Sequence, residues 1–146
     1  METRIATSIE QSKKLIELGI DINTADMHYS TWTILNEGEY ILSPNQGETI
    51  EELQEDYGNQ VIPAWSLSAL IQVLPITIVD SWTDYCLMLD IKAKMPRYVK
   101  YGDVYHPEFP WDFKKQSLLD NIVESIFWLH NNNYLNGSNR SNLFNL

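Results

Sequence analysis

The chain has 146 residues, the length of one domain, and it carries 20 acidic against 10 basic residues, a formal net charge of −10. Hydrophobic residues make up 44% of it, which predicts a buried core and excludes a disordered chain. The single cysteine, Cys86, excludes an intrachain disulfide. The chain starts without the apolar run of a signal peptide, and its longest apolar stretch is interrupted by polar residues and proline. We therefore expect a cytoplasmic protein with no membrane contact.

Acidic residues are concentrated in the first part of the chain. Residues 1–60 hold 12 acidic and 3 basic residues, whereas residues 61–146 hold 8 and 7. Between Glu37 and Asp56 there are seven acidic residues and no basic one. Such a surface repels phosphate, so nucleic-acid binding is disfavoured and a protein partner is expected. The short basic stretch at 92–100 indicates either a solvated strand face or a contact with an acidic partner, such as a second copy in a homodimer.

The first predicted helix spans residues 9–18. Ser8 and Gln11 have the spacing of a capping box, in which each side chain bonds the backbone N–H of the other residue. Apolar residues then recur at helical spacing, and Gly19 suits the left-handed conformation that commonly ends a helix. The following stretch, 20–29, is expected to be a loop with one short turn.

A β-hairpin and a second helix are expected next. Residues 30–43 place apolar and β-branched residues on both sides of a polar turn that contains Gly38, a pattern typical of a hairpin. Thr49 and Glu52 repeat the capping-box spacing at the start of a helix that Gly58 ends. The apolar face of this helix is expected to consist of Ile50, Leu53 and Tyr57.

The stretch PAWSLSALIQVLP is predicted to lead into an amphipathic helix. Its apolar residues recur at helical spacing from Leu67 to Leu74, and Pro75 stops the helix. Ser66 is suited to cap the N-terminus through its hydroxyl, with Trp65 packing just before it. Because no glycine flanks Ser66, the G-x-S-x-G motif of a catalytic serine is absent.

Three segments are predicted to form an antiparallel sheet. Residues 76–79 are mostly β-branched, residues 85–94 alternate between two faces, and residues 97–101 follow as their partner. The connections are too short for parallel crossovers. A final helix over residues 118–129, opened by Ser117, has a wide apolar face that is expected to cover the sheet.

The predicted fold class is α+β, with an antiparallel sheet of three to five strands packed by three or four helices in one domain. This domain is expected to span residues 1–135, and the asparagine-rich residues 136–146 are expected to form a flexible tail. The sequence lacks a P-loop, a dinucleotide-binding glycine motif, a metalloprotease motif and a paired-cysteine motif. Cys86 has no histidine nearby in the sequence, which argues against a nucleophilic role.

Two short acid–histidine pairs are candidate metal ligands. Asp26 and His28 form a D-x-H pair, and His106 and Glu108 form an H-x-E pair. Residues two apart in an extended segment point the same way, so each pair could offer two ligands to one ion. The alternative is that both histidines lie in loops and make ordinary hydrogen bonds. His130 is expected in the last turn of the final helix, where the helix dipole favours a cation.

An aromatic segment follows the predicted sheet. Five aromatic residues lie between Tyr101 and Phe113, and two prolines stiffen the backbone. They are expected to be either partner-binding hot spots or anchors under a long loop. The aromatic residues that we predict to contact a partner are Tyr101, Tyr105, Phe109 and Trp111. The acidic residues that we predict to do so are Glu51, Glu52 and Glu55.

Three segments of the chain resemble a known group of proteins. The segments are ATSIEQSKKLIELGIDINTADM, IPAWSLSALIQVLP and WLHNNNYL, and they are similar to short uncharacterised proteins that phages and mobile elements of gut bacteria encode. The resemblance implies a cytoplasmic accessory factor that acts on host components. It implies no activity and no functional residues.

The leading hypothesis is a non-enzymatic interaction protein that binds a protein partner through its acidic or aromatic surface. It assigns no catalytic residue, metal or cofactor. The alternative is a small metal-dependent hydrolase that uses Asp26, His28, His106 and Glu108. A third hypothesis, an acidic decoy for DNA-binding proteins, requires carboxylates spaced like phosphates along one face.

Overall fold

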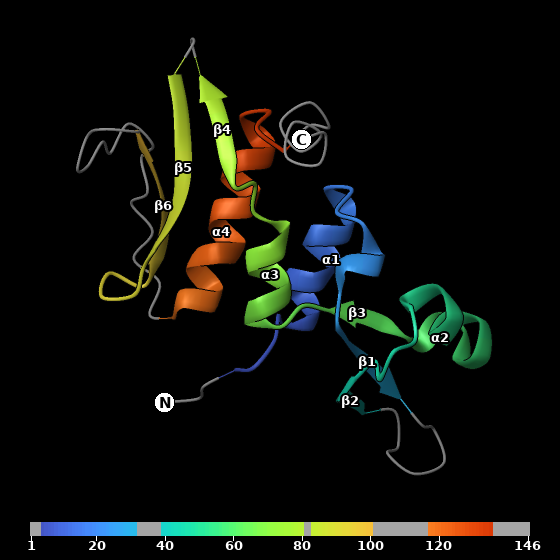
Figure 1. Ribbon diagram of the computed structural model, residues 1–146. Helices are drawn as coiled ribbons and strands as arrows, with labels where there is room; N and C mark the ends of the chain where they lie inside the picture. Colours follow the sequence, from blue (N-terminus) through green and yellow to red (C-terminus); the bar gives the residue numbers. More distant parts are fainter. Residues whose placement is uncertain (1–3, 32–38, 81–82, 101–116, 136–146) are drawn as a thin grey trace. The chain divides into compact units, whose positions relative to one another are not determined.

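The computed structural model describes residues 4–31, 39–80, 83–100 and 117–135 (Figure 1). In these residues it has four α-helices and two three-stranded antiparallel sheets, which confirms the predicted α+β class. The chain divides into unit 1, residues 1–72, and unit 2, residues 73–146. The expected domain bounds stay a prediction, and the expected tail lies outside the described residues.

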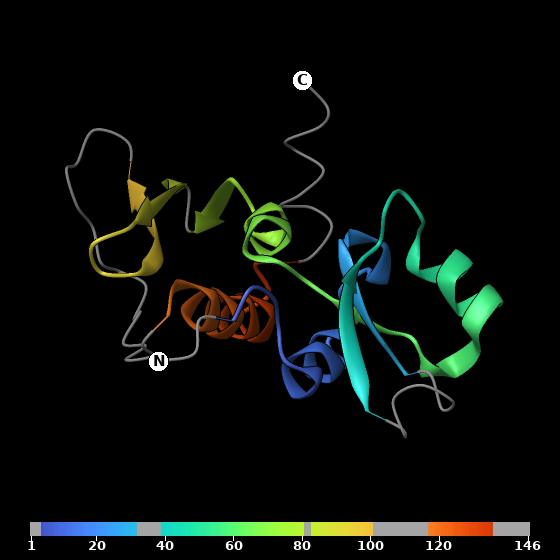
Figure 2. The same cartoon turned by 90° about the horizontal axis from the view of Figure 1, so that it is seen from below.

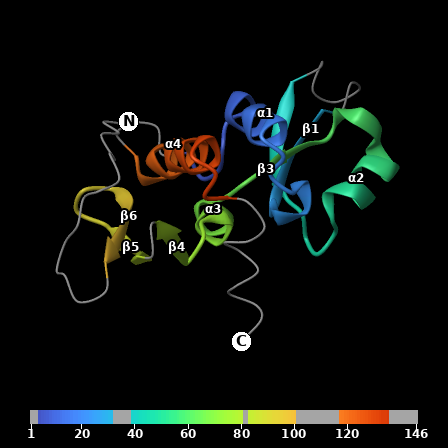
Figure 3. The same ribbon diagram turned by 90° about the horizontal axis from the view of Figure 1, so that it is seen from above.

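Unit 1 is built around a small sheet with strand order β2-β1-β3. Its central strand β1 is antiparallel to both neighbours. Figures 2 and 3 show helix α1 on one side of this sheet and helix α2 on the other. The elements are α1 (Ile9–Glu17), η1 (Ile22–Thr24), β1 (Met27–Thr31), β2 (Tyr40–Pro44), α2 (Ile50–Tyr57), η2 (Gly58–Gln60), β3 (Ile62–Ala64) and α3 (Leu67–Val73), the last of which reaches the boundary with unit 2.

The predicted capping box at the start of α1 is confirmed. The Ser8 hydroxyl accepts a hydrogen bond from the Gln11 N–H at 3.1 Å, and the Gln11 side chain accepts one from the Ser8 N–H at 3.0 Å. At the other end, Gly19 has a φ of 87°, the left-handed conformation expected there. Local capping chemistry therefore sets both ends of this helix.

The expectation of a loop over residues 20–29 is wrong at its end, because β1 begins at Met27. The burial of β1 alternates, with His28 and Ser30 on the buried side. On the other side, the Tyr29 hydroxyl donates to the Thr7 carbonyl at 2.7 Å. The buried positions of β1 are thus occupied by polar residues, so the apolar–polar pattern of the sequence does not indicate a strand here. The predicted hairpin pairing of β1 with β2 is confirmed, and its turn lies outside the described residues.

Helix α2 begins and ends as predicted. The Thr49 hydroxyl accepts from the Glu52 N–H at 3.1 Å, and Gly58 follows the helix with a φ of 77°. On the face predicted to hold Ile50, Leu53 and Tyr57, the first two residues are buried, whereas Tyr57 is 51% exposed. The tyrosine sits at the last turn of the helix, where it borders a pocket described below.

The helix predicted from the stretch PAWSLSALIQVLP is also confirmed. The Ser66 hydroxyl accepts from the Ala69 N–H at 3.2 Å and donates to the Asp26 carboxylate. Trp65 is fully buried, and its indole N–H donates to the Thr24 hydroxyl at 2.9 Å. Ser66 therefore acts as a helix cap, as its position in the sequence indicates.

Unit 2 contains the sheet predicted from residues 76–101. Its strand order is β4-β5-β6, all antiparallel, and α4 packs against β6. The Tyr98 hydroxyl on β6 is buried and donates to the Pro75 carbonyl at 2.7 Å. The Asn121 side chain of α4 donates to the Lys94 carbonyl. The elements are β4 (Thr77–Asp80), β5 (Thr83–Asp90), β6 (Met95–Lys100) and α4 (Leu118–Asn131).

The prediction of one long strand over residues 85–94 is wrong, because β5 ends at Asp90 and residues 91–94 form the turn into β6. Asp90 accepts a hydrogen bond from the Ala93 N–H at 2.9 Å and lies 3.1 Å from Arg97 Nε. The hydrogen bond from the Ala93 N–H is the largest cause that lowers the pKa of the Asp90 carboxyl, and the hydrogen bond and charge of Arg97 lower it further. In the sequence the apolar–polar alternation continues through residues 91–94, so it does not mark the end of β5.

In the part of the chain that the structure describes, no helix is long and apolar enough to cross a membrane.

Candidate functional site

A polar pocket of about 570 Å³ lies in unit 1. This volume is within the usual range for sites that bind small molecules or side chains. We call it the α2 pocket, because α2 forms one of its walls. It is lined by His28, Ser30, Thr31, Ser43, Pro44, Asn45, Gln46, Glu48, Leu53, Tyr57 and Gln60.

The floor of the α2 pocket is fixed by a chain of hydrogen bonds. His28 is only 8% exposed, and its Nδ1 lies 2.8 Å from the Asn45 carbonyl oxygen Oδ1. The Asn45 amide nitrogen donates in turn to the Ala25 carbonyl at 3.0 Å. Since the amide nitrogen is used in this way, Oδ1 is the acceptor and Nδ1 of His28 carries the proton. In the neutral ring, Nε2 is then the nitrogen with a free lone pair.

Strand pairing brings hydroxyl groups next to this histidine. His28 on β1 is directly opposite Ser43 on β2, so both side chains are on the same face of the sheet. Ser30 is two residues along β1 and lies on that face as well. Ser30 and Ser43 both line the pocket together with His28. The pocket therefore offers several polar groups that a ligand can use.

Glu48 lies at the rim of the α2 pocket and is the only charged residue among the described residues that line it. Leu53 and Tyr57, one helical turn apart on α2, form the adjoining wall. No lysine or arginine is among the described residues that line the pocket. The site is therefore rich in acceptors and favours positive charge.

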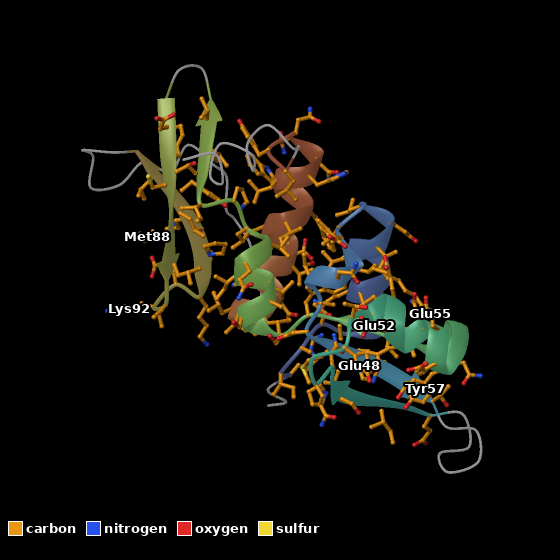
Figure 4. All side chains as sticks on the ribbon, turned by 45° about the vertical axis from the view of Figure 1, so that its right-hand side comes forward. Glu48, Glu52, Glu55, Tyr57, Met88 and Lys92 are labelled. Carbon is orange, nitrogen blue, oxygen red and sulfur yellow. The ribbon has the colours of Figure 1, made fainter. Side chains whose placement is uncertain are left out.

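The three glutamates predicted to contact a partner lie together on α2. Glu51, Glu52 and Glu55 are all exposed on this helix. Figure 4 shows Glu52 and Glu55 beside Glu48 and Tyr57. We define the α2 acidic surface as Glu48, Glu51, Glu52, Glu55 and Asp56. Among the described residues, no lysine or arginine pairs with these carboxylates, and only Glu51 accepts a hydrogen bond, from Asn23 at 3.4 Å.

The structure gives the candidate metal ligands Asp26 and His28 separate partners. Both Asp26 oxygens bond to Ser66, one to its N–H at 2.9 Å and the other to its hydroxyl. His28 bonds to Asn45 instead. Within the described ranges, no three His, Cys, Asp or Glu side chains are placed to hold a metal ion. His106 and Glu108 lie outside those ranges, so the four-ligand hypothesis stays a prediction.

The predicted aromatic contacts also lie outside the described residues, namely Tyr101, Tyr105, Phe109 and Trp111.

Of the other candidates, Cys86 is half-buried on β5. His130 is in the last turn of α4, as predicted. In the basic stretch, Lys92 and Lys94 are exposed in the turn after β5, whereas Arg97 pairs with Asp90.

Sequence reasoning missed the α2 pocket as a unit. The D-x-H spacing indicates His28 as a candidate metal ligand, and nothing in the sequence connects it with Asn45. The one local signal is Asn45 itself, a polar residue in a short turn sequence. In the structure the Asn45 side chain is almost fully buried. Its role depends on two partners, Ala25 and His28, that are 20 and 17 residues away.

Comparisons with protein-family models, with characterised proteins and with solved structures find no significant match to this chain.

Proposed function

We propose that this chain is a non-enzymatic binding protein that recognises a positively charged protein partner through the α2 acidic surface. The observation that carries the proposal is the set of five exposed carboxylates on one eight-residue helix and the turn before it. The leading sequence hypothesis allowed an acidic or an aromatic surface. The described geometry supports the acidic one.

Two pairs of these carboxylates repel each other in the free protein. Glu51 and Glu55 are four residues apart on the helix, as are Glu52 and Asp56. Like charges at this spacing repel by about 0.2–0.5 kcal/mol per pair. A partner that presents lysine or arginine would remove this repulsion and gain ion pairs at the same time. Positive potential on the partner would also accelerate its encounter with the surface at low salt.

The test compares two variants with the same formal net charge. The first is Glu51→Gln/Glu52→Gln, on α2, and the second is Glu10→Gln/Glu17→Gln, on exposed positions of α1. Binding of the full chain to a panel of lysine- and arginine-rich peptides is measured by fluorescence anisotropy, with acidic peptides of the same length as a reference. We expect binding to weaken about tenfold in the α2 variant and less than twofold in the α1 variant.

A second measurement identifies the natural partner. The wild-type chain and both variants are used to capture proteins from cells that express them, and the captured proteins are quantified by mass spectrometry. The partner is a basic protein that is lost with the α2 variant and retained with the α1 variant. Equal losses with both variants would show that net charge, rather than α2, controls binding, and would contradict the proposal.

A further inference from the structure

The α2 pocket has the chemistry of a site for a planar cation. Its floor offers the Nε2 lone pair of His28, because Nδ1 of the ring is already committed to Asn45. Its rim offers the carboxylate of Glu48, and Ser30 and Ser43, which also line it, add hydroxyl oxygens. A guanidinium group has five N–H donors and no acceptor, so it complements this set of acceptors.

We infer that the α2 pocket binds the guanidinium group of an arginine side chain, presented by the partner. This inference rests on the proposed function and names the anchor residue of that partner. Arginine is preferred to lysine for two reasons. Its planar fork reaches several acceptors at once, and it can stack on the ring of Tyr57, which is half-exposed at the pocket wall.

The position of the α2 pocket fits this role. Glu48 belongs both to the pocket and to the α2 acidic surface, so a basic segment that crosses α2 passes the pocket mouth. The surface then attracts the partner through charge, and the pocket selects one side chain through hydrogen bonds. Charge alone gives weak specificity, whereas a desolvated arginine is a typical hot spot of an interface.

The binding test uses the full chain labelled with ¹⁵N and three small probes. They are N-acetyl-arginine amide, its neutral isostere N-acetyl-citrulline amide, and N-acetyl-lysine amide. We expect the arginine probe to bind with a Kd on the order of millimolar and to shift the backbone amides of His28, Ser43 and Asn45. Citrulline should cause no saturable shift, and lysine should bind at least about threefold more weakly. Equal binding of citrulline or of lysine would overturn the guanidinium assignment.

The imidazole itself supplies a readout that needs no mutation. Long-range ¹H–¹⁵N spectra above neutral pH should show His28 protonated at Nδ1, with the Nε2 resonance moving when the arginine probe is added. A ring protonated at Nε2, or an Nε2 resonance that the probe leaves unchanged, would overturn the inference.

Glu48→Gln should weaken binding of the probe about threefold to fivefold, the size expected for a solvent-exposed ion pair. The matched control Glu17→Gln, at an exposed position of α1 outside both the pocket and the α2 acidic surface, should leave it unchanged, and an equal loss would overturn the inference.

The two proposals fail in different ways. If basic peptides bind through Glu51 and Glu52 while the arginine probe causes no shift at His28, the inference fails and the proposed function survives. If the arginine probe binds in the pocket while basic peptides do not bind α2, the proposed function fails and only a site for free arginine-like ligands remains.

Discussion

The Tyr98 hydroxyl shows how one polar atom is accommodated in the core of unit 2. The side chain is 1% exposed, and its hydroxyl donates to the Pro75 carbonyl at 2.7 Å. Burial raises the pKa of Tyr98 well above its ordinary value, because the phenolate would lie in apolar surroundings. The hydrogen bond thus satisfies two buried groups, and removing it leaves the carbonyl with one partner fewer.

The first prediction concerns this bond. Tyr98→Phe should lower the free energy of unfolding by about 1–3 kcal/mol, because a buried carbonyl loses a hydrogen bond while the ring is retained. The matched control is Tyr40→Phe, at a position that is 42% exposed, where a change below about 0.5 kcal/mol is expected. Urea unfolding of the full chain measures both. Equal effects at the two positions would show that the hydroxyl of Tyr98 has no special role.

The second prediction is a loss of stability at alkaline pH. Burial also raises the pKa of Tyr29, although the charge of Arg4 partly opposes it. A phenol whose folded pKa is raised stabilises the protein fully below the unfolded pKa, near 10, and this stabilisation is lost as pH rises toward the folded value. The free energy of unfolding should therefore fall above about pH 10, and less steeply in Tyr98→Phe. A pH titration of phenolate absorbance, with urea unfolding at each pH, tests this. Identical slopes in both proteins would contradict it.

At the scale of elements, α2 combines good caps and first-turn acids, which the helix dipole favours, with repulsive pairs of carboxylates four residues apart. Thr49 and Gly58 fix its ends, whereas Glu51 faces Glu55 at the i,i+4 spacing. Helix α1 is the opposite case, since Glu10 and Lys14 have the favourable order and spacing. The two helices therefore form an internal comparison for charge effects.

The third prediction uses this comparison. Glu55→Lys should stabilise the protein by about 0.5 kcal/mol, because it replaces a repulsive pair with an attractive one near the helix C-terminus. Glu10→Lys makes the same change in net charge but removes a favourable pair and places a cation in the first turn of α1. It should destabilise by a similar amount. Chemical unfolding of both variants is the measurement. A gain from both substitutions would mean that total charge, rather than helix position, decides the effect.

The same elements show what the sequence could and could not reveal. The starts of the helices were predictable, because Ser8, Thr49, Ser66 and Ser117 each cap a backbone N–H within three residues. Strand β1 was placed too late, because its buried residues are polar and are satisfied by distant partners. The end of β5 was missed because Asp90 forms a turn inside a continuing alternation. The α2 pocket depends on contacts between segments that local patterns do not connect.

At the scale of the whole molecule, the net negative charge belongs almost entirely to unit 1. Residues 61–72 carry no charged side chain, so unit 1 holds 12 acidic and 3 basic residues, and unit 2 holds 8 and 7. Their formal charges are therefore −9 and −1. Self-repulsion of this size destabilises a folded unit at low ionic strength and is screened by salt.

The fourth prediction is that salt stabilises unit 1 more than unit 2. Raising NaCl from about 10 mM to about 300 mM shortens the screening length from about 30 Å to less than 10 Å, which removes most repulsion between exposed carboxylates. Amide hydrogen exchange of the full chain should show a gain in protection of up to about 1 kcal/mol in β1 and α1, and a smaller gain in α4. The less charged unit serves as the internal reference for any general effect of salt on apolar burial. In Glu51→Gln/Glu52→Gln the difference between the units should shrink, since two of the repelling charges are removed. Equal gains in both units of the wild-type chain would mean that the acidic residues of unit 1 are too widely spaced to destabilise it, and that repulsion is confined to the pairs within α2.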